Sequence, residues 1–239
     1  MICGTHIPNK SPAVVRGFLL VLAFFFFQEA WAEEQQSQGY RFEQKVIRQF
    51  TGKENFETSY TSKWDIPAEF NTATGRPVSV KCIRWGNSVY LGDALRQRKI
   101  SEPFEMVIGF YEADKKEGLA RLKALHHLTI RPEDWNRWWG GITFEEIERL
   151  NAGIKNKPLE EAQAFARDLA AKLRKKPGIV DLNPKVNKDQ RRIQCSIPFN
   201  VFFREIIGRE PEAQVRFEIL GKDFPESFRL GARSRYQSE

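Results

Sequence analysis

Asp65, Lys81, Glu43 and Glu69 are the side chains whose types and spacing could do chemistry together. Carboxylate oxygens bind Mg²⁺ while leaving coordination positions open for water. A metal held in this way stabilises charge on a phosphorane and lowers the pKa of an attacking water, which a lysine can orient or deprotonate. Phosphodiester hydrolysis is therefore the reaction that this set of residues would support.

The first of these residues belongs to a predicted helix. Apolar residues recur at helical spacing from 42 to 50, and Gly52 is placed to end the helix, which predicts a helix from about 39 to 51. Glu43 shares a stripe with Val46, Ile47 and Phe50, so its carboxylate is expected along the buried face. A buried carboxylate must be paired, hydrogen-bonded or metal-bound.

The other three residues belong to a predicted β-hairpin. Two β-rich runs, 59–70 and 78–85, are separated by the segment 71–77, which has turn chemistry at both ends. The two-residue period puts Asp65, Pro67 and Glu69 on one face of the first strand, and Ser79, Lys81 and Ile83 on one face of the second. If the two faces coincide, two carboxylates and an ammonium converge beside the helix, but the sequence leaves the register open.

These residues resemble a known family. Glu43 on a helix, Asp65, and Lys81 sixteen residues later in Pro77-Val-Ser-Val-Lys-Cys-Ile-Arg84 resemble the PD-(D/E)XK nuclease superfamily, which has the restriction-endonuclease-like fold. The resemblance covers about 39–111, and more loosely 179–203, where the chain is reminiscent of type II restriction enzymes. It implies a mixed sheet flanked by helices, Mg²⁺ as cofactor and DNA as substrate. It also implies that Asp65 binds the metal, that Lys81 serves the attacking water, and that Glu43 is the helix acid.

The sequence departs from the family pattern at two positions. The second acid should stand two residues before the lysine, where this chain has Ser79, and Trp64 precedes Asp65 in place of proline. Two interpretations compete. In the first, the acid has migrated to Glu69 or Glu43, so the metal site is Asp65 with these two glutamates. In the second, the site is degraded and binds nucleic acid without cutting it.

A basic stretch offers a surface for a polyanion. The chain carries 38 Lys and Arg against 31 Asp and Glu, a formal charge of +7, and residues 172–192 hold eight basic and two acidic side chains. Some of the cations end a predicted helix, where they complement its dipole. The others lie across a turn between two predicted strands, where a solvated hairpin tip is the alternative to a phosphate and base contact surface. The candidate contacts are Lys185, Lys188, Arg191, Arg192 and Gln194, with Arg84 from a second basic cluster at 76–99.

The rest of the body is expected to form one mixed α/β domain. A core at about 39–111 is followed by a helical insertion at about 132–176 and a β-rich basic tail at about 179–220. The expected elements are a short helix at 91–100, a central strand at 104–111, a segment at 119–130 with a strand towards its end, a helix opened by a Thr143 and Glu146 capping box, a helix at 160–176, and strands at 179–186, 192–203 and 215–220.

The N-terminus has the three parts of a secretory signal. Lys10 and Arg16 precede the ten-residue apolar run 18–27, and Ala30-Trp31-Ala32 follows it, which predicts cleavage after Ala32 and export of residues 33–239. Ten residues cannot cross a bilayer core that needs about twenty. A buried helix, an uncleaved anchor, or a cytoplasmic enzyme with a misassigned start codon are the alternatives.

Composition excludes several other classes. Three Cys and three His are too few for a disulfide scaffold or a multi-zinc protein, and adjacent His126 and His127 would point to opposite faces of a strand. The sequence contains neither a nucleophile elbow nor a P-loop, and no small organic cofactor is expected. Cys82 and Cys195 could pair or stay buried as thiols, and burial is expected for Cys82. Two functions remain: an exported DNA endonuclease, expected by analogy to dimerise, and an exported basic binding module with the same fold. Trp135, Trp138 and Trp139 are expected in the core.

Overall fold

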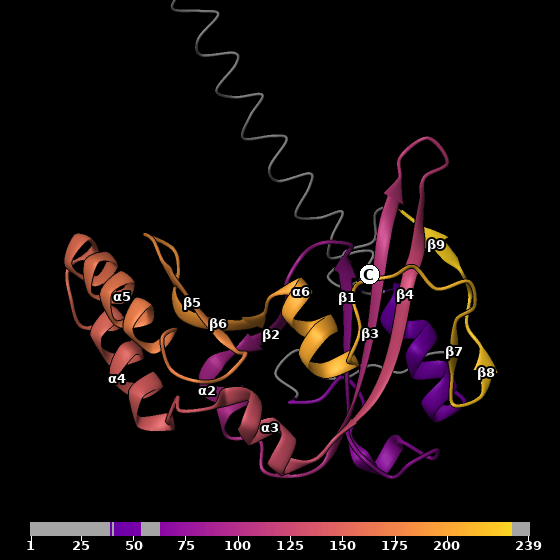
Figure 1. The fold of residues 1–239 in the computed structure, drawn as a ribbon, viewed down its shortest axis with the longest axis horizontal. Coiled ribbons are helices and arrows are strands. Elements are labelled where there is room, and N and C mark those ends of the chain that lie inside the picture. Colours follow the sequence, from indigo (N-terminus) through magenta and orange to yellow (C-terminus); the bar gives the residue numbers. More distant parts are fainter. Residues whose placement is uncertain (1–38, 40, 54–62, 231–239) are drawn as a thin grey trace, which may run out of the picture.

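The chain folds around a curled four-stranded sheet, seen in a computed structural model that describes residues 39, 41–53 and 63–230 (Figure 1). The parallel pairing of its first two strands and the antiparallel pairing of the others make this main sheet mixed. The predicted mixed α/β class is confirmed. In spatial order, the strands are β1 (Val78–Arg84), β3 (Phe104–Asp114), β4 (Leu119–Ile130) and β9 (Ser227–Arg229).

A second, antiparallel sheet lies beside β1 in Figure 1. Its order is β2 (Val89–Asp93), β6 (Arg191–Ile197) and β5 (Asp181–Val186), so β6 is central. The predicted strand-turn-strand arm at 179–203 is therefore present as the β5–β6 hairpin, although it ends earlier than expected. A two-stranded ribbon of β7 (Glu218–Ile219) and β8 (Lys222–Asp223) completes the strands of the described residues.

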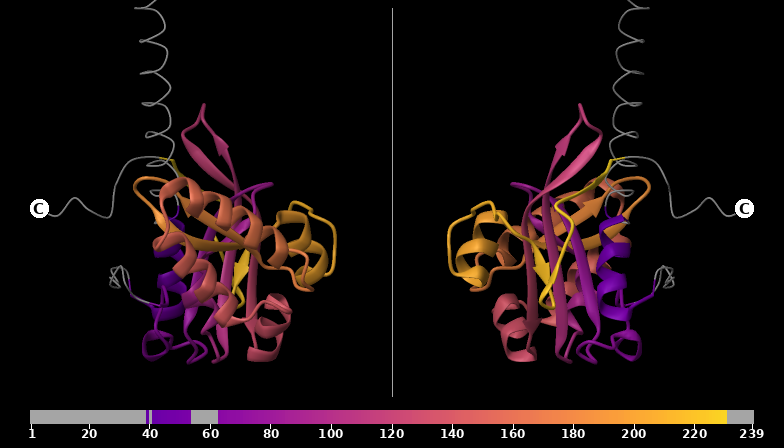
Figure 2. Two further views of the ribbon diagram at one scale, coloured as in Figure 1. Left: turned by 90° about the vertical axis from the view of Figure 1, so that its left-hand side faces the viewer. Right: turned by 90° about the vertical axis from the view of Figure 1, so that its right-hand side faces the viewer.

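Helices cover both faces of the main sheet, as Figure 2 shows. A helix over residues 41–51 packs on one face, and the other face is covered by α3 and by α6 with its π-helical continuation η2. The remaining helices support the second sheet. The bounds are α2 (Ala94–Arg98), α3 (Pro132–Trp139), α4 (Phe144–Lys155), α5 (Leu159–Leu173), α6 (Phe199–Val201), η2 (Phe202–Ile207) and the 3-10 helix η1 (Ala68–Phe70).

The main sheet divides the interior into two hydrophobic cores. Val80, Val107 and the helix 41–51 belong to one core, while Ile83, Ile108 and α3 belong to the other. Strand β3 is buried on both faces because its run of apolar residues lies between β1 and β4. At Gly109, the helix approaches so closely that an added Cβ would lie 2.4 Å from the Phe42 ring, so this position requires glycine.

The predicted hairpin of 59–70 with 78–85 is wrong in its first strand. Residues 59–62 lie outside the described part of the chain, and residues 63–70 pair with β1 only at the single bridge between Ile66 and Val78. Pro67 follows at once, and its carbonyl accepts a hydrogen bond from Phe70 at 3.1 Å, which starts η1. Because Pro67 has no N–H to donate, the ladder ends there.

Three further boundaries differ from the prediction. The helix expected at 91–100 begins only at Ala94, because β2 runs to Asp93, whose carboxylate caps α2 by accepting the Arg96 N–H at 2.9 Å. Residues after Pro198 turn into α6 and η2 and do not continue the strand. Of the strand expected at 215–220, only Glu218 and Ile219 pair, and Val215 is 96% exposed.

Other predictions are confirmed. The Thr143 and Glu146 capping box opens α4, and the range 132–176, expected to be helical, contains α3, α4 and α5. Trp135, Trp138 and Trp139 are buried. None of the helices among the described residues is long and apolar enough to span a membrane. The predicted signal at 1–32 lies outside the described residues.

Candidate active site and nucleic-acid interface

Asp65 and Lys81 form an ion pair at the edge of the main sheet. Lys81 Nζ lies 3.6 Å from Asp65 Oδ2, and the two side chains are 20% and 28% exposed. The same Asp65 oxygen accepts the Val80 N–H at 2.7 Å, and Lys81 Nζ donates to the Val80 carbonyl at 3.1 Å. The segment before the Ile66 bridge thus presents a carboxylate to the edge of β1, within reach of solvent.

Asp93 is an acid at the end of β2 that the sequence pattern did not single out. It is the N-cap residue of α2 and pairs with Gln194, next to Cys195 on β6. Burial raises the pKa of the Cys195 thiol, the negative charge of Asp93 raises it further, and the positive charge of Lys81 lowers it. Asp93 and Lys81 thus both act on the charge state of Cys195.

The other two predicted acids are not gathered with Asp65. Glu69 is exposed on η1 and does not share a strand face with Asp65. Glu43 is half-buried on the helix 41–51, whose buried stripe begins at Phe42, and this helix packs on the Val80 face of β1, opposite to Lys81. Among the residues that the structure describes, no three Asp, Glu, His or Cys side chains form a group able to hold a metal ion.

Ser79, at the position of the missing acid, is buried and only 8% exposed. It shares a strand face with Lys81 because the two residues are two apart on β1. This face of β1 therefore presents a serine hydroxyl and no carboxylate beside Lys81, and Asp65 is the acid that contacts Lys81.

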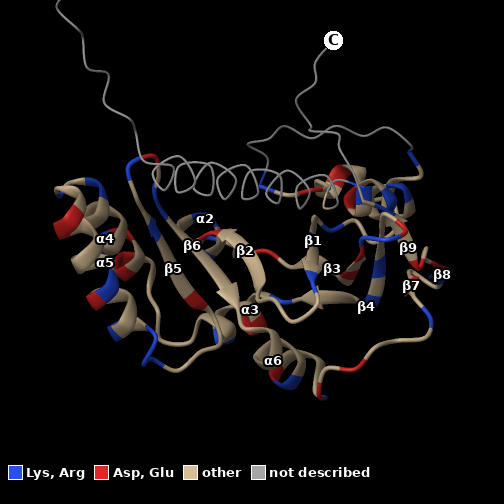
Figure 3. Cartoon of the chain, turned by 90° about the horizontal axis from the view of Figure 1, so that it is seen from above, with Lys and Arg blue, Asp and Glu red and all other residues tan. Residues whose placement is uncertain are grey.

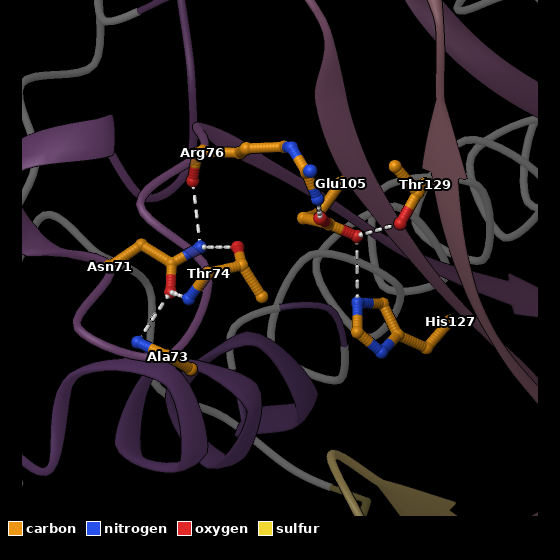
Figure 4. Close-up of polar contacts among 7 residues, drawn as sticks. All are labelled: Asn71, Ala73, Thr74, Arg76, Glu105, His127 and Thr129. Atoms are coloured by element: carbon orange, nitrogen blue, oxygen red, sulfur yellow. Dashed lines mark hydrogen bonds and ion pairs between the residues drawn. The ribbon is translucent and has the colours of Figure 1, made fainter.

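A buried carboxylate, Glu105, organises the start of β1 (Figure 4). Its oxygens accept hydrogen bonds from Arg76 Nη1 at 2.8 Å and Thr129 Oγ1 at 3.0 Å, and lie 2.9 Å from His127 Nε2. Burial alone would raise the pKa of Glu105, but the hydrogen bonds of His127, Arg76 and Thr129 hold it below its ordinary value. The carboxylate therefore stays charged and joins the segment before β1 to β3 and β4.

Asn71 fixes the same segment from its other end (Figure 4). Its Oδ1 accepts the N–H groups of Ala73 and Thr74 at 3.0 Å each, and its Nδ2 donates to the Arg76 carbonyl at 2.7 Å. The segment that connects Asp65 to β1 is thus held by a buried polar network at both ends. The network places Val78 in register with Ile66 and so sets where Asp65 meets β1.

One face of the second sheet is polar, and its cations gather at the turn end of the β5–β6 hairpin. Cross-strand pairs place Lys185 beside Arg192 and Asn183 beside Gln194, and the side chains of these residues alternate with the buried Ile193 and Cys195. Asp181 and Asp93 lie at the other end of the same face. Lys185, Lys188 and Arg192, the basic end of the hairpin, are exposed, and none of them forms an ion pair with any described residue. Figure 3 shows basic positions along the β5–β6 hairpin.

Two of the predicted contacts have structural partners. Arg191 Nη1 donates to the carbonyls of Ile154 and Lys157 at 2.9 and 2.6 Å, so its guanidinium holds the end of α4. Arg84 is half-buried at the end of β1. These two arginines are less suited to a phosphate contact than the three exposed cations of the hairpin.

A groove of about 570 Å³ flanks the hairpin on its α5 side. Alanines of α5 and the side chains of Pro184 and Val186 on β5 line it, together with Arg167 and Arg174. Arg174 Nε lies 3.4 Å from Asp181, while both arginines are exposed. From the sequence, the cations at the end of α5 were explained by their attraction to the helix dipole. The groove could not be predicted, because it forms only where β5 packs against α5.

The cysteines and histidines lie apart from the pair of Asp65 and Lys81. Cys82 and Cys195 are unpaired thiols, and burial raises the pKa of both. Cys195 is fully buried, whereas Cys82, for which burial was expected, is only half-buried. His126 and His127 point to opposite faces of β4, as expected: His127 meets Glu105, and His126 lies among aromatic rings. The candidate site stands on the geometry of this chain, since no family model, curated protein or solved structure matches it.

Proposed function

We propose that the chain is a Mg²⁺-dependent endonuclease that hydrolyses DNA phosphodiester bonds, with Asp65 and Lys81 at its centre. The observation that carries the proposal is the contact between these two side chains at 3.6 Å at the open edge of β1. Both side chains stay partly exposed, at 20% and 28%, so a phosphate at the edge of β1 could reach them. A carboxylate and an ammonium beside a basic surface suit a phosphodiester.

The residues fit one metal ion held by a single side-chain carboxylate. Asp65 Oδ2 is used by Val80 and Lys81, whereas Oδ1 has no hydrogen-bond partner among the described residues. Mg²⁺ commonly takes one or two carboxylates and completes its shell with water and substrate phosphate oxygens. When bound there, the metal would supply charge neutralisation at the phosphate and a water of lowered pKa. Asp93 is a further acid to test, because its charge acts on Cys195, as the charge of Lys81 does.

The protein's own groups would position the reactants. The Lys81 ammonium can donate a hydrogen bond to a non-bridging phosphate oxygen or to the attacking water while it keeps its contact to Asp65. The Val80 N–H holds the Asp65 carboxylate in place, so that its free oxygen keeps one direction. The two groups thus stay preorganised before substrate binds.

The basic end of the β5–β6 hairpin supports the proposal that DNA is the substrate. Lys185, Lys188 and Arg192 supply attraction to phosphates that does not depend on sequence, and the amides of Gln194 and Asn183 can bond to base edges. Arg167 and Arg174 in the adjacent groove extend the positive surface onto α5. A polyanion that lies across the hairpin would also reach the end of β2, where Asp93 lies.

A binding module without nuclease chemistry is the second candidate. The observation that favours it is the separation of Asp65 from Glu43 and Glu69, because no group of three metal-binding side chains exists among the described residues. In this alternative, the basic end of the β5–β6 hairpin binds nucleic acid, and the ion pair between Asp65 and Lys81 has no catalytic role.

Cleavage of supercoiled plasmid separates the two candidates. The wild-type protein should nick or linearise the plasmid in Mg²⁺ and not in EDTA, while Lys81→Ala should be inactive. Lys116→Ala is a matched control, because Lys116 lies at the turn of the projecting β3–β4 hairpin (Figure 2). Absence of cleavage with Mg²⁺ or Mn²⁺, together with salt-sensitive binding, would support the binding module.

We further propose export, cleavage after Ala32, and a homodimer by analogy with enzymes that cut both strands. Sequencing the N-terminus of protein from its native host should give Glu33 as the first residue. A chain that starts at Met1 or at an internal residue of the apolar run would contradict processing at this site. Sedimentation of the mature protein with DNA would test the dimer.

A further inference from the structure

Tyr90 is an exposed aromatic residue on the polar face of the second sheet. It is 50% exposed, whereas its neighbours Val89 and Leu91 on β2 are 0% and 2% exposed. Because side chains alternate along a strand, Val89 and Leu91 enter the core and Tyr90 points to the other face. Within the described part of the chain, its ring stacks on no aromatic ring and its hydroxyl makes no hydrogen bond.

The surroundings of Tyr90 are those of a nucleic-acid surface. On β6, it pairs with Ser196, whose hydroxyl accepts a hydrogen bond from Asn183 Nδ2 at 2.8 Å. Gln194 lies on the same face next to Ser196, and the exposed cations Lys185 and Arg192 follow along the hairpin. The two acids of this face, Asp181 and Asp93, are engaged by Arg174 and by the Arg96 N–H. The ring and the exposed cations can therefore supply stacking and phosphate attraction to a strand.

We propose that Tyr90 is a stacking platform for an unpaired base, so that the preferred substrate class is DNA with unpaired bases. This inference rests on the proposed function only in calling the bound DNA a substrate; the stacking of a base on Tyr90 does not require cleavage. A base inside a duplex already stacks on its neighbours and cannot lie on a protein ring without leaving the stack. A base in a single strand, flap or mismatch presents its π face at little cost.

Binding of a fluorescein-labelled single-stranded oligonucleotide, measured by anisotropy in EDTA, tests the inference without cleavage. Tyr90→Ala should weaken this binding about 10-fold or more, and Tyr90→Phe should stay within about twofold of wild type, because the ring is what stacks. Tyr90→Leu keeps apolar bulk without a π face and should behave like Tyr90→Ala. Binding of a fully paired duplex of the same sequence should change less than about twofold in all three variants.

Equal losses for single strand and duplex, or wild-type affinity of Tyr90→Ala for the single strand, would overturn the inference. Its failure is distinguishable from failure of the proposed function. If plasmid cleavage needs Lys81 but Tyr90→Ala binds normally, the nuclease stands and the platform falls. If the Tyr90 effect appears but no metal supports cleavage, the platform stands in a binding module. Urea unfolding of each variant confirms that this exposed position leaves the fold intact.

Discussion

One oxygen of the Asp65 carboxylate binds both the backbone of Val80 and the side chain of Lys81. The carboxylate accepts the Val80 N–H at 2.7 Å and, from the same oxygen, meets the Lys81 ammonium at 3.6 Å. Because β1 is the edge strand of the main sheet in the described chain, its outward N–H would otherwise face solvent. A single carboxylate thus satisfies the strand edge and forms the charged pair.

Asp65→Asn should separate the chemical role of this carboxylate from its structural role. The amide oxygen of Asn can still accept the Val80 N–H, so the free energy of unfolding should change by no more than about 1 kcal/mol. Loss of the negative charge should lower plasmid cleavage about a hundredfold or more. Urea unfolding and initial cleavage rates measure the two effects, and a fully active Asp65→Asn protein would remove Asp65 from the mechanism.

Replacing the buried carboxylate of Glu105 should destabilise the fold. Glu105→Leu leaves Arg76, His127 and Thr129 without their acceptor, and breaking a buried charge pair costs about 3–5 kcal/mol. The expected loss lies at the lower end, because Arg76 is 44% exposed and can turn to water. Glu112→Gln on the same strand is the matched control: Glu112 is 56% exposed and should change stability by less than about 0.5 kcal/mol. Equal effects at both positions would show that the network is not a structural centre.

His126 should make the protein less stable in mild acid. Burial, together with the positive charge of Arg209, lowers its pKa from 6.5 to about 4. Between these two values, the unfolded chain binds a proton that the folded chain does not, so stability rises with pH across this window and is lost as the pH falls through it. The full loss is about 3 kcal/mol.

Urea unfolding between pH 7 and pH 4 measures this loss. His126→Leu should flatten the slope above pH 4.5, because it removes the titrating ring from a pocket lined by Phe110, Phe202 and Phe203. Glu105 acts in a lower window, because its pKa is held below its ordinary value of 4.5. Its stabilisation is present above that value and is lost only in stronger acid. An unchanged slope in His126→Leu would assign the acid sensitivity elsewhere.

The cations of the β5–β6 hairpin should differ in what they contribute. Lys185→Ala and Arg192→Ala should each weaken DNA binding and lower the slope of log K against log salt by about 0.9, because each removes one phosphate contact. Arg191→Ala should mainly lower stability, since its guanidinium holds two carbonyls at the end of α4. Anisotropy over a salt series and urea unfolding separate the two kinds of arginine. Equal salt slopes in all three variants would contradict the assigned surface.

Local signals predicted much of the fold. The dense apolar run at 104–111 became the buried strand β3, the Thr143 capping box opened α4, and the turn at 187–190 joined β5 to β6. The errors arose where a single proline ended a strand pattern. Pro67 ended a run that had strand composition, and Pro198 ended the strand predicted at 192–203, after which the chain enters α6.

The candidate site was predictable only in part. The types and spacing of Asp65 and Lys81 indicated that they could meet, but their contact depends on a carboxylate that caps a strand edge and not on a paired strand. The charges of Asp93 and Lys81 both act on Cys195 although the two residues belong to separate sheets, which spacing cannot reveal. Glu105 did leave a signal, because a charged residue inside the apolar run 104–111 requires buried partners.

The most direct test measures DNA binding and DNA cleavage by one variant, Lys81→Ala. Lys81 is half-buried at the edge of β1 and lies outside the hairpin that carries the exposed cations. The expected result is duplex affinity in EDTA within about threefold of wild type, and a plasmid cleavage rate in Mg²⁺ lower by about a thousandfold. A Lys81→Ala protein that cleaves at the wild-type rate would contradict the proposed active site.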